Sequence, residues 1–146
     1  GFIFTTALPP ALAAAATAAR NARATGLAGR AGFAVCDGAS AACGPVDVLV
    51  SNPPYIPSAD IAGLDLEVRA HDPRLALDGG PDGLAFYRQL AGSAAGLVSS
   101  DGAVAVEFGI GQAESVGEIF RAAQLDRQKI VDDLAGLPRV LLARWH

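Results

Sequence analysis

The four residues Asn52, Pro53, Pro54 and Tyr55 combine groups that can hold a flat NH2 group. The asparagine side-chain oxygen and a proline carbonyl can accept its two hydrogens, which aims the nitrogen lone pair at an electrophile. Proline restricts the backbone, and the tyrosine ring offers a face on which an amide or a base can stack. The pattern suits methylation of an amide or an aromatic amine. The alternative is a rigid turn, because Asn-Pro and Pro-Pro are common turn dipeptides.

The surrounding sequence predicts alternating strands and helices. Short apolar runs predict strands at 2–5, 32–36, 46–51, 102–108, 129–132 and 139–144, and helical spacing predicts helices at 10–25, 82–99 and 112–123. This alternation predicts an α/β fold with a parallel sheet and helices on both faces. Ligands bind beyond the carboxyl ends of such strands, where Asn52 to Tyr55 fall. The long connection that follows, to about Pro81, predicts a functional loop.

Composition narrows the classes of protein that the chain can represent. Its 146 residues are 51% hydrophobic and 18% charged, which predicts one globular domain over 1–146. Charged residues and prolines interrupt every apolar run, and no basic region precedes the N-terminal one, so we expect a cytoplasmic protein without a membrane span. The net charge of -4 argues against nucleic-acid binding. Cys36 and Cys43 lack metal-ligand spacing and are interpreted as reduced thiols without a metal.

Four segments carry a specific resemblance: VDVLVSNPPYIPSADI, EVRAHDPRLALDGGPDGLAFYRQL, VAVEFGIGQAESV and DLAGLPRVLLAR, in this order. Together they resemble the catalytic domain of the release-factor glutamine N5-methyltransferases. The resemblance implies a three-layer, Rossmann-like S-adenosylmethionine-dependent methyltransferase fold. It also implies S-adenosylmethionine as the cofactor and a glutamine side chain of a peptide-chain release factor as the substrate.

The resemblance also implies roles for particular residues. Asn52, Pro53, Pro54 and Tyr55 match the family's substrate motif, with Asn52 also close to the methyl donor. Asp37 matches an acidic position beside the adenine, and Gly38 matches a neighbouring position that often carries a large aromatic residue; a plain turn glycine is the alternative. Thr6 occupies the position of the acidic residue that receives the ribose hydroxyls. Threonine lacks the charge that strengthens such bonds, so we expect weaker ribose binding; helix capping is the alternative role.

In other respects the sequence departs from the family. The family's first strand and its glycine loop would precede Gly1, so the fold is expected to lack both. Removing that strand would leave two sheet edges unpaired, so we expect the protein either to self-associate through these edges or to fill the gap with its own N-terminus. Two other functions stay open. One is adenine N6 methylation of DNA, since the motif suits any flat NH2 group; the other is a truncated, non-catalytic remnant that no longer binds cofactor.

Two further groups of residues resemble functional motifs but lack a residue that the function requires. Gly109-Ile110-Gly111 follows a predicted strand and opens a predicted helix, as a dinucleotide-binding loop does. It lacks the third glycine of such a loop, so we do not interpret it as one. Glu67, Arg69, His71 and Asp72 have no accompanying nucleophile, so a structural ion-pair network is predicted.

Overall fold

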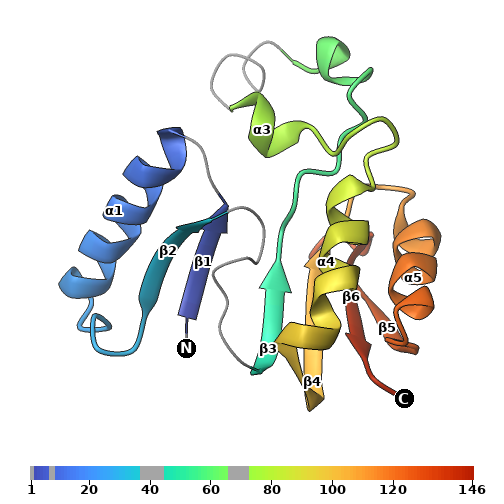
Figure 1. Ribbon diagram of the computed structural model, residues 1–146. Coiled ribbons are helices and arrows are strands. Elements are labelled where there is room, and N and C mark those ends of the chain that lie inside the picture. Colours follow the sequence, from blue (N-terminus) through green and yellow to red (C-terminus); the bar gives the residue numbers. More distant parts are fainter. Residues whose placement is uncertain (1, 7–8, 37–44, 66–72) are drawn as a thin grey trace. The chain divides into compact units, whose positions relative to one another are not determined.

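A computed structural model of the chain describes residues 2–6, 9–36, 45–65 and 73–146. The chain forms two compact units, Gly1–Cys43 and Gly44–His146. Strands and helices alternate through both units, which confirms the predicted α/β class (Figure 1). None of the described helices is long and apolar enough to cross a membrane.

The first unit consists of β1 (Phe2–Thr6), α1 (Pro9–Ala24) and β2 (Gly32–Cys36). β1 and β2 run parallel, and Thr6 lies opposite Cys36 at their carboxyl ends. α1 begins at two prolines, where the missing N–H groups would have no helical partner. It ends before Gly26, whose φ of +72° is the left-handed conformation that glycine adopts at helix ends. The three elements predicted for this segment are confirmed.

The second unit contains a four-stranded sheet in the order β3-β4-β6-β5. Its strands are β3 (Val46–Ser51), β4 (Val98–Glu107), β5 (Arg127–Asp132) and β6 (Pro138–Arg144). β3 and β4 run parallel, whereas β6 is antiparallel to both β4 and β5. The prediction of a parallel sheet is therefore wrong at β6, the strand of this sheet that runs opposite to the other three. Five residues join β5 to β6, which is enough for a hairpin and too few for a parallel crossover.

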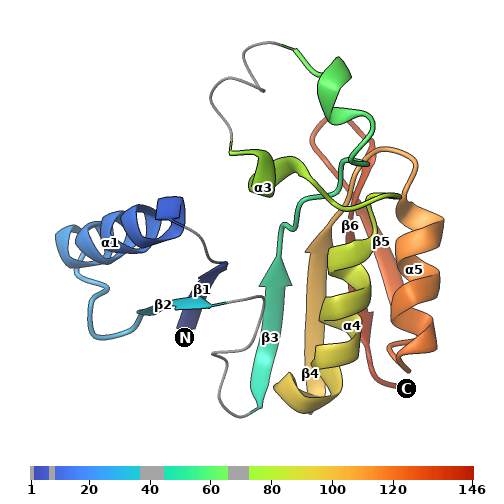
Figure 2. The same ribbon diagram turned by 45° about the horizontal axis from the view of Figure 1, so that its top comes forward.

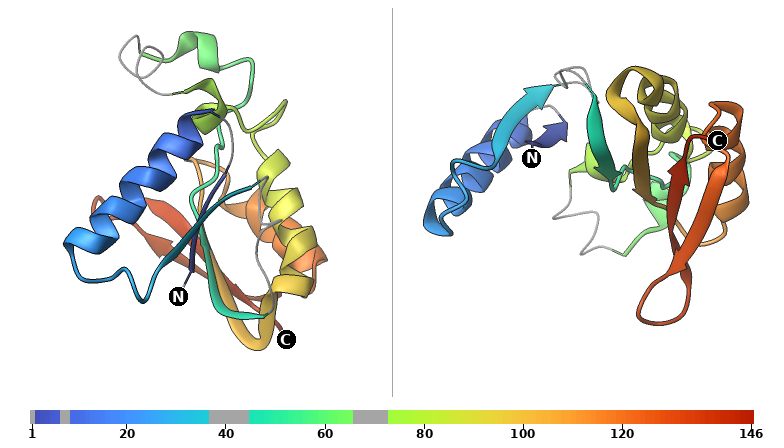
Figure 3. Two further views of the ribbon diagram at one scale, coloured as in Figure 1. Left: turned by 60° about the vertical axis from the view of Figure 1, so that its left-hand side comes forward. Right: turned by 90° about the horizontal axis from the view of Figure 1, so that it is seen from below.

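Two helices, α4 (Ala85–Leu97) and α5 (Ala113–Ala122), lie on the same face of this sheet (Figures 2 and 3). The core between helices and sheet consists of fully buried side chains, among them Tyr87, Val104, Val106, Val116, Phe120 and Leu141. Within this unit the expectation of helices on both faces is not met by the described residues. The other face of β3 carries the exposed side chains of Val48 and Val50.

The boundary between α4 and β4 differs from the prediction. The helix ends at Leu97 and the strand begins at once at Val98, four residues earlier than expected. The early part of β4 pairs irregularly with β3, with a register shift between Val46 and Val48. Gly102 lies at this irregularity, where a β-carbon would come within 2.6 Å of the Val98 side chain. The sequence pattern did not reveal the extra strand residues because the apolar run resumes only after Gly102.

The connection between β3 and α4 is partly ordered into short elements. It contains the 3-10 turn η1 (Ile61–Gly63) and the single-turn helix α3 (Arg74–Leu77). Ile56 and Asp78 form an isolated parallel bridge, which brings the two ends of the connection together. The connection is long, as expected, and the sequence pattern did not predict these short elements within it.

Candidate functional site

The Asn52–Tyr55 loop begins directly after the carboxyl end of β3, as predicted. Asn52 is exposed, Pro53 is buried, and Pro54 and Tyr55 are half-buried. No hydrogen bond joins the Asn52 side chain to any residue that the structure describes. Because the two prolines that follow Asn52 restrict the backbone, this exposed amide can bind a ligand with little loss of conformational entropy.

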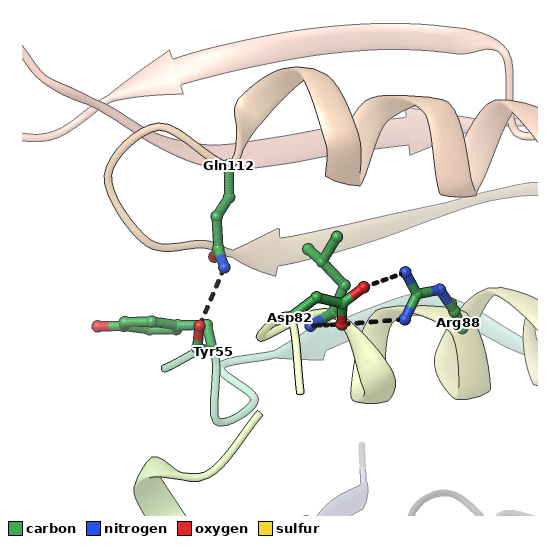
Figure 4. A network of polar contacts seen from close by, with 5 residues as sticks. Tyr55, Asp82, Arg88 and Gln112 are labelled. Atoms are coloured by element: carbon green, nitrogen blue, oxygen red, sulfur yellow. Dashed lines mark hydrogen bonds and ion pairs between the residues drawn. The ribbon is translucent and has the colours of Figure 1, made fainter. Parts of the chain in front are cut away.

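The carbonyl oxygen of Tyr55 accepts a hydrogen bond from the side chain of Gln112, 57 residues later in the chain (Figure 4). The Gln112 Nε2 atom lies 2.9 Å from that oxygen. The Oε1 atom of the same amide accepts a bond of 2.9 Å from the backbone N–H of Gly109. One side-chain amide therefore joins the loop after β3 to the loop after β4. The sequence prediction assigned no role to Gln112.

Two glycines pack closely against the backbone of the Asn52–Tyr55 loop. A β-carbon on Gly83 would overlap the carbonyl oxygen of Tyr55 and lie 2.8 Å from Gln112 Nε2. A β-carbon on Gly79 would lie 2.9 Å from the carbonyl oxygen of Pro54. Only glycine permits such approaches, so these residues are more than the turn signals that the sequence suggested. The sequence shows both the glycines and the proline-containing loop, but no local pattern indicates that they contact each other.

The segment that follows the loop is tied back to its own far end. The backbone N–H of Ile56 donates to the Leu77 carbonyl over 3.1 Å, and the N–H of Gly79 donates to the Ile56 carbonyl over 2.8 Å. The Ser58 hydroxyl donates to the Asp78 carboxylate over 2.6 Å. This bond, with a second from the Gly80 N–H, lowers the pKa of Asp78. These hydrogen bonds hold the two ends of the connection next to each other, beside the Asn52–Tyr55 loop.

Tyr87 forms a hydrogen bond to the last residue of β4. Its ring is fully buried, and its hydroxyl donates to the Glu107 carbonyl over 2.9 Å. Burial raises the pKa of Tyr87, and the nearby Tyr55 and Glu107 raise it further. The hydroxyl therefore remains protonated and keeps donating at neutral pH.

Asp82 lies at the start of α4, beside Gly83 (Figure 4). Its carboxylate accepts a bond from the Leu84 N–H at 3.1 Å and two bonds from the Arg88 guanidinium. The Arg88 bonds, followed by the Leu84 bond, lower the pKa of Asp82 from 3.8 to about 2. This exposed ion pair joins the residue before Gly83 to the first turn of α4.

Of the four residues expected to hold the cofactor, two lie outside the described part of the chain. Thr6 ends β1, and its side chain is not described; Asp37 and Gly38 lie outside the described residues. The register places Thr6 beside Cys36, which Asp37 directly follows in sequence. Asn52 is the member of this predicted set whose side chain is described.

Two other predictions also concern side chains that are not described. The side chains of Cys36 and Cys43 are not described, nor are the four residues of the predicted ion-pair network, Glu67, Arg69, His71 and Asp72. Gly109-Ile110-Gly111, by contrast, is described and forms the exit of β4 toward α5.

Comparison with known proteins gives a consistent result. No protein-family model matches the chain. It is 55% identical to a release factor glutamine methyltransferase of Rhodospirillum rubrum over 127 residues, 87% of this chain and 39% of that protein. Similarly named proteins of Bradyrhizobium diazoefficiens and Moorella thermoacetica are 50% and 43% identical, over 88% and 97% of this chain.

The chain is homologous to part of the release factor glutamine methyltransferases. The resemblance stated from the sequence is therefore confirmed. The chain spans 39 to 50% of the length of these three relatives.

Proposed function

We propose that the chain contributes the substrate site of an S-adenosylmethionine-dependent methyltransferase that modifies the side-chain amide nitrogen of a glutamine in a peptide-chain release factor. The observation that supports this most is the Asn52 amide, which is exposed and has no partner among the described residues at the carboxyl end of β3. Three relatives named for this activity support the same substrate class. Their names favour a protein acceptor over a DNA base.

Both units belong, in this proposal, to one catalytic domain with the three-layer methyltransferase fold. Their strands are parallel at β1–β2 and β3–β4, as that fold requires of its central strands. The residues proposed to hold S-adenosylmethionine are Thr6, Asp37, Gly38 and Asn52. Thr6 and Asp37 suit this role, since the β1–β2 register brings Thr6 beside Cys36 and the chain continues from Cys36 to Asp37.

In the proposed reaction, the chain orients the acceptor nitrogen. The Asn52 side-chain oxygen and the Pro53 carbonyl accept the two N–H groups of the glutamine amide, which leaves the nitrogen lone pair pointing away from the loop. When bound, S-adenosylmethionine supplies a methyl group on a sulfonium sulfur, and the carbon–sulfur electron pair stays on sulfur as the nitrogen–carbon bond forms. Tyr55 packs its ring against the flat amide. The nitrogen then releases one proton to water, so a strong base is not needed.

A methylation assay tests this proposal. The chain is incubated with S-adenosylmethionine carrying a labelled methyl group and with a release factor, and mass spectrometry locates the label. We expect one methyl group on a glutamine side-chain amide. Label on adenine of added DNA, or no transfer to either acceptor, would contradict the proposal.

We also propose that the chain self-associates through the free edge of β3. Within the described residues of its own unit, β3 pairs with β4 alone, so its other edge has no partner strand there. Unpaired edges readily pair with a second chain. Sedimentation velocity at rising protein concentration should show a dimer, and a monomer at every concentration would contradict this proposal.

A further inference from the structure

We infer that Gln112 is a positioning residue that holds the Asn52–Tyr55 loop against the exit of β4, and this role rests on the proposed function of that loop. Both polar atoms of its side chain bond backbone atoms of the chain. It acts through the backbone of Tyr55, which continues directly from Asn52, Pro53 and Pro54.

The position of Gln112 relative to the sheet is the first argument. Ser51 and Val106 are the last residue pair of the parallel β3–β4 ladder. The segments that follow the two strands are no longer joined by ladder hydrogen bonds, so the ladder does not fix the position of Tyr55 relative to Gly109. The Gln112 amide spans this gap with one donor and one acceptor, 2.9 Å from each backbone partner. It therefore continues the connection between the strands past the end of the sheet.

The side-chain type is the second argument. Gln112 is the N-cap of α5, but its side chain makes no capping bond to that helix. Glutamine is also not among the favoured N-cap residues. An uncharged amide offers, on two separate atoms, a donor for the Tyr55 carbonyl and an acceptor for the Gly109 N–H. Helix capping therefore does not explain the residue, whereas bridging the two loops does.

The close packing around the Gln112 amide is the third argument. A β-carbon on Gly109 would lie 2.9 Å from both Gln112 Oε1 and the Tyr55 ring, and one on Gly83 would lie 2.8 Å from Gln112 Nε2. Glycines on two sides thus leave just enough space for the amide. The exit of β4 is itself held, because the Phe108 N–H donates to the Arg139 carbonyl over 2.9 Å and Tyr87 binds the Glu107 carbonyl. Gln112 therefore joins the loop to a strand end that is itself hydrogen-bonded.

The test uses two substitutions that separate the two bonds. Gln112→Leu removes both, whereas Gln112→Glu keeps an oxygen for the Gly109 N–H and sets a second oxygen against the Tyr55 carbonyl. Gln128→Leu is the matched control, since the Gln128 Nε2 atom also donates to two backbone carbonyls, of Gly117 and Leu125, at 2.8 Å each. It should lower stability in a similar way without altering the loop.

Two readouts are measured for each variant: amide hydrogen exchange at Gly109 by NMR, and the single-turnover rate of methyl transfer. In Gln112→Leu we expect Gly109 exchange to rise about tenfold, in line with the loss of one hydrogen bond. In Gln112→Glu, Gly109 should stay protected while methyl transfer falls about as far as in Gln112→Leu, with the affinity for S-adenosylmethionine unchanged. Gln128→Leu should alter neither readout.

Two results would overturn the inference: unchanged Gly109 exchange in Gln112→Leu, or methyl transfer that falls equally in Gln128→Leu. If the unsubstituted chain transfers no methyl group, the proposed function fails. Gly109 exchange in the same proteins then still decides whether Gln112 holds the two loops together.

Discussion

Replacing Gly83 by alanine places a methyl group against the carbonyl oxygen that Gln112 holds. The added carbon would overlap the Tyr55 oxygen and crowd Gln112 Nε2. Gly83 also has a φ of +74°, which costs an L-residue about 1–2 kcal/mol. Loss of the Gln112–Tyr55 hydrogen bond adds about 1 kcal/mol. We therefore expect Gly83→Ala to lower the free energy of unfolding by about 2–3 kcal/mol, a large part of the roughly 5–15 kcal/mol typical of a domain.

Gly136→Ala is the matched control for this experiment. Gly136 has a similar φ of +78°, but no atom lies within 4 Å of its added β-carbon. It should therefore cost only the backbone conformation, about 1–2 kcal/mol. The gain from a less flexible unfolded chain is common to both variants and cancels in the comparison.

Urea unfolding followed by circular dichroism measures both variants. With slopes of about 1–3 kcal/mol per molar, Gly83→Ala should unfold roughly 0.5 M earlier than Gly136→Ala. Gly83→Ala should also slow methyl transfer, because the Tyr55 carbonyl is displaced, whereas Gly136→Ala should not. Equal midpoints and equal transfer rates in the two variants would refute the reasoning that Gly83 packs against the loop.

Three further predictions concern the ring, the cofactor and the ion pair. Tyr55→Phe should slow methyl transfer less than Tyr55→Ala, because it keeps the ring that packs on Gly109 and that we propose to contact the acceptor. Equal rate losses would assign the effect to the hydroxyl. Thr6→Asp should tighten S-adenosylmethionine binding about tenfold by calorimetry, because a charge-assisted bond replaces a neutral one; unchanged affinity would remove Thr6 from the ribose site. The pKa of Asp82 is lowered to about 2, so the stability from its carboxylate is present above about pH 4 and is lost as the pH falls toward 2. The difference in urea midpoint between the unsubstituted chain and Asp82→Asn should shrink over this window, and a constant difference would contradict the ion-pair assignment.

Local sequence patterns were sufficient for most elements of the fold. The strands 32–36 and 46–51 agree with the prediction residue for residue. Each is a short apolar run, and a glycine or a proline stands at one of its ends. The reversed direction of β6 was not foreseen, although the five-residue link from β5 to β6 is too short for a parallel crossover. Periodicity reports how a strand is buried and says little about which neighbour it pairs with.

The candidate site was predictable only at the loop itself. Asn52 to Tyr55 form a contiguous motif, so their chemistry can be read from adjacent residues. Gln112 and Gly83 act on that loop through contacts with Tyr55 that span 57 residues in one case and 28 in the other. Such contacts depend on how the strand exits meet in space. No spacing rule in the sequence encodes them.

The most direct test of the account is the single-turnover rate of methyl transfer to a release-factor glutamine by Asn52→Ala. Asn21→Ala is the matched control, since Asn21 is the other asparagine of the chain and lies exposed on α1. The account predicts a fall of about 10² to 10³ in Asn52→Ala, the usual consequence of losing one positioned hydrogen-bonding group, and no loss in Asn21→Ala. A rate in Asn52→Ala within about threefold of the unsubstituted chain would contradict the role of the Asn52 amide in orienting the acceptor.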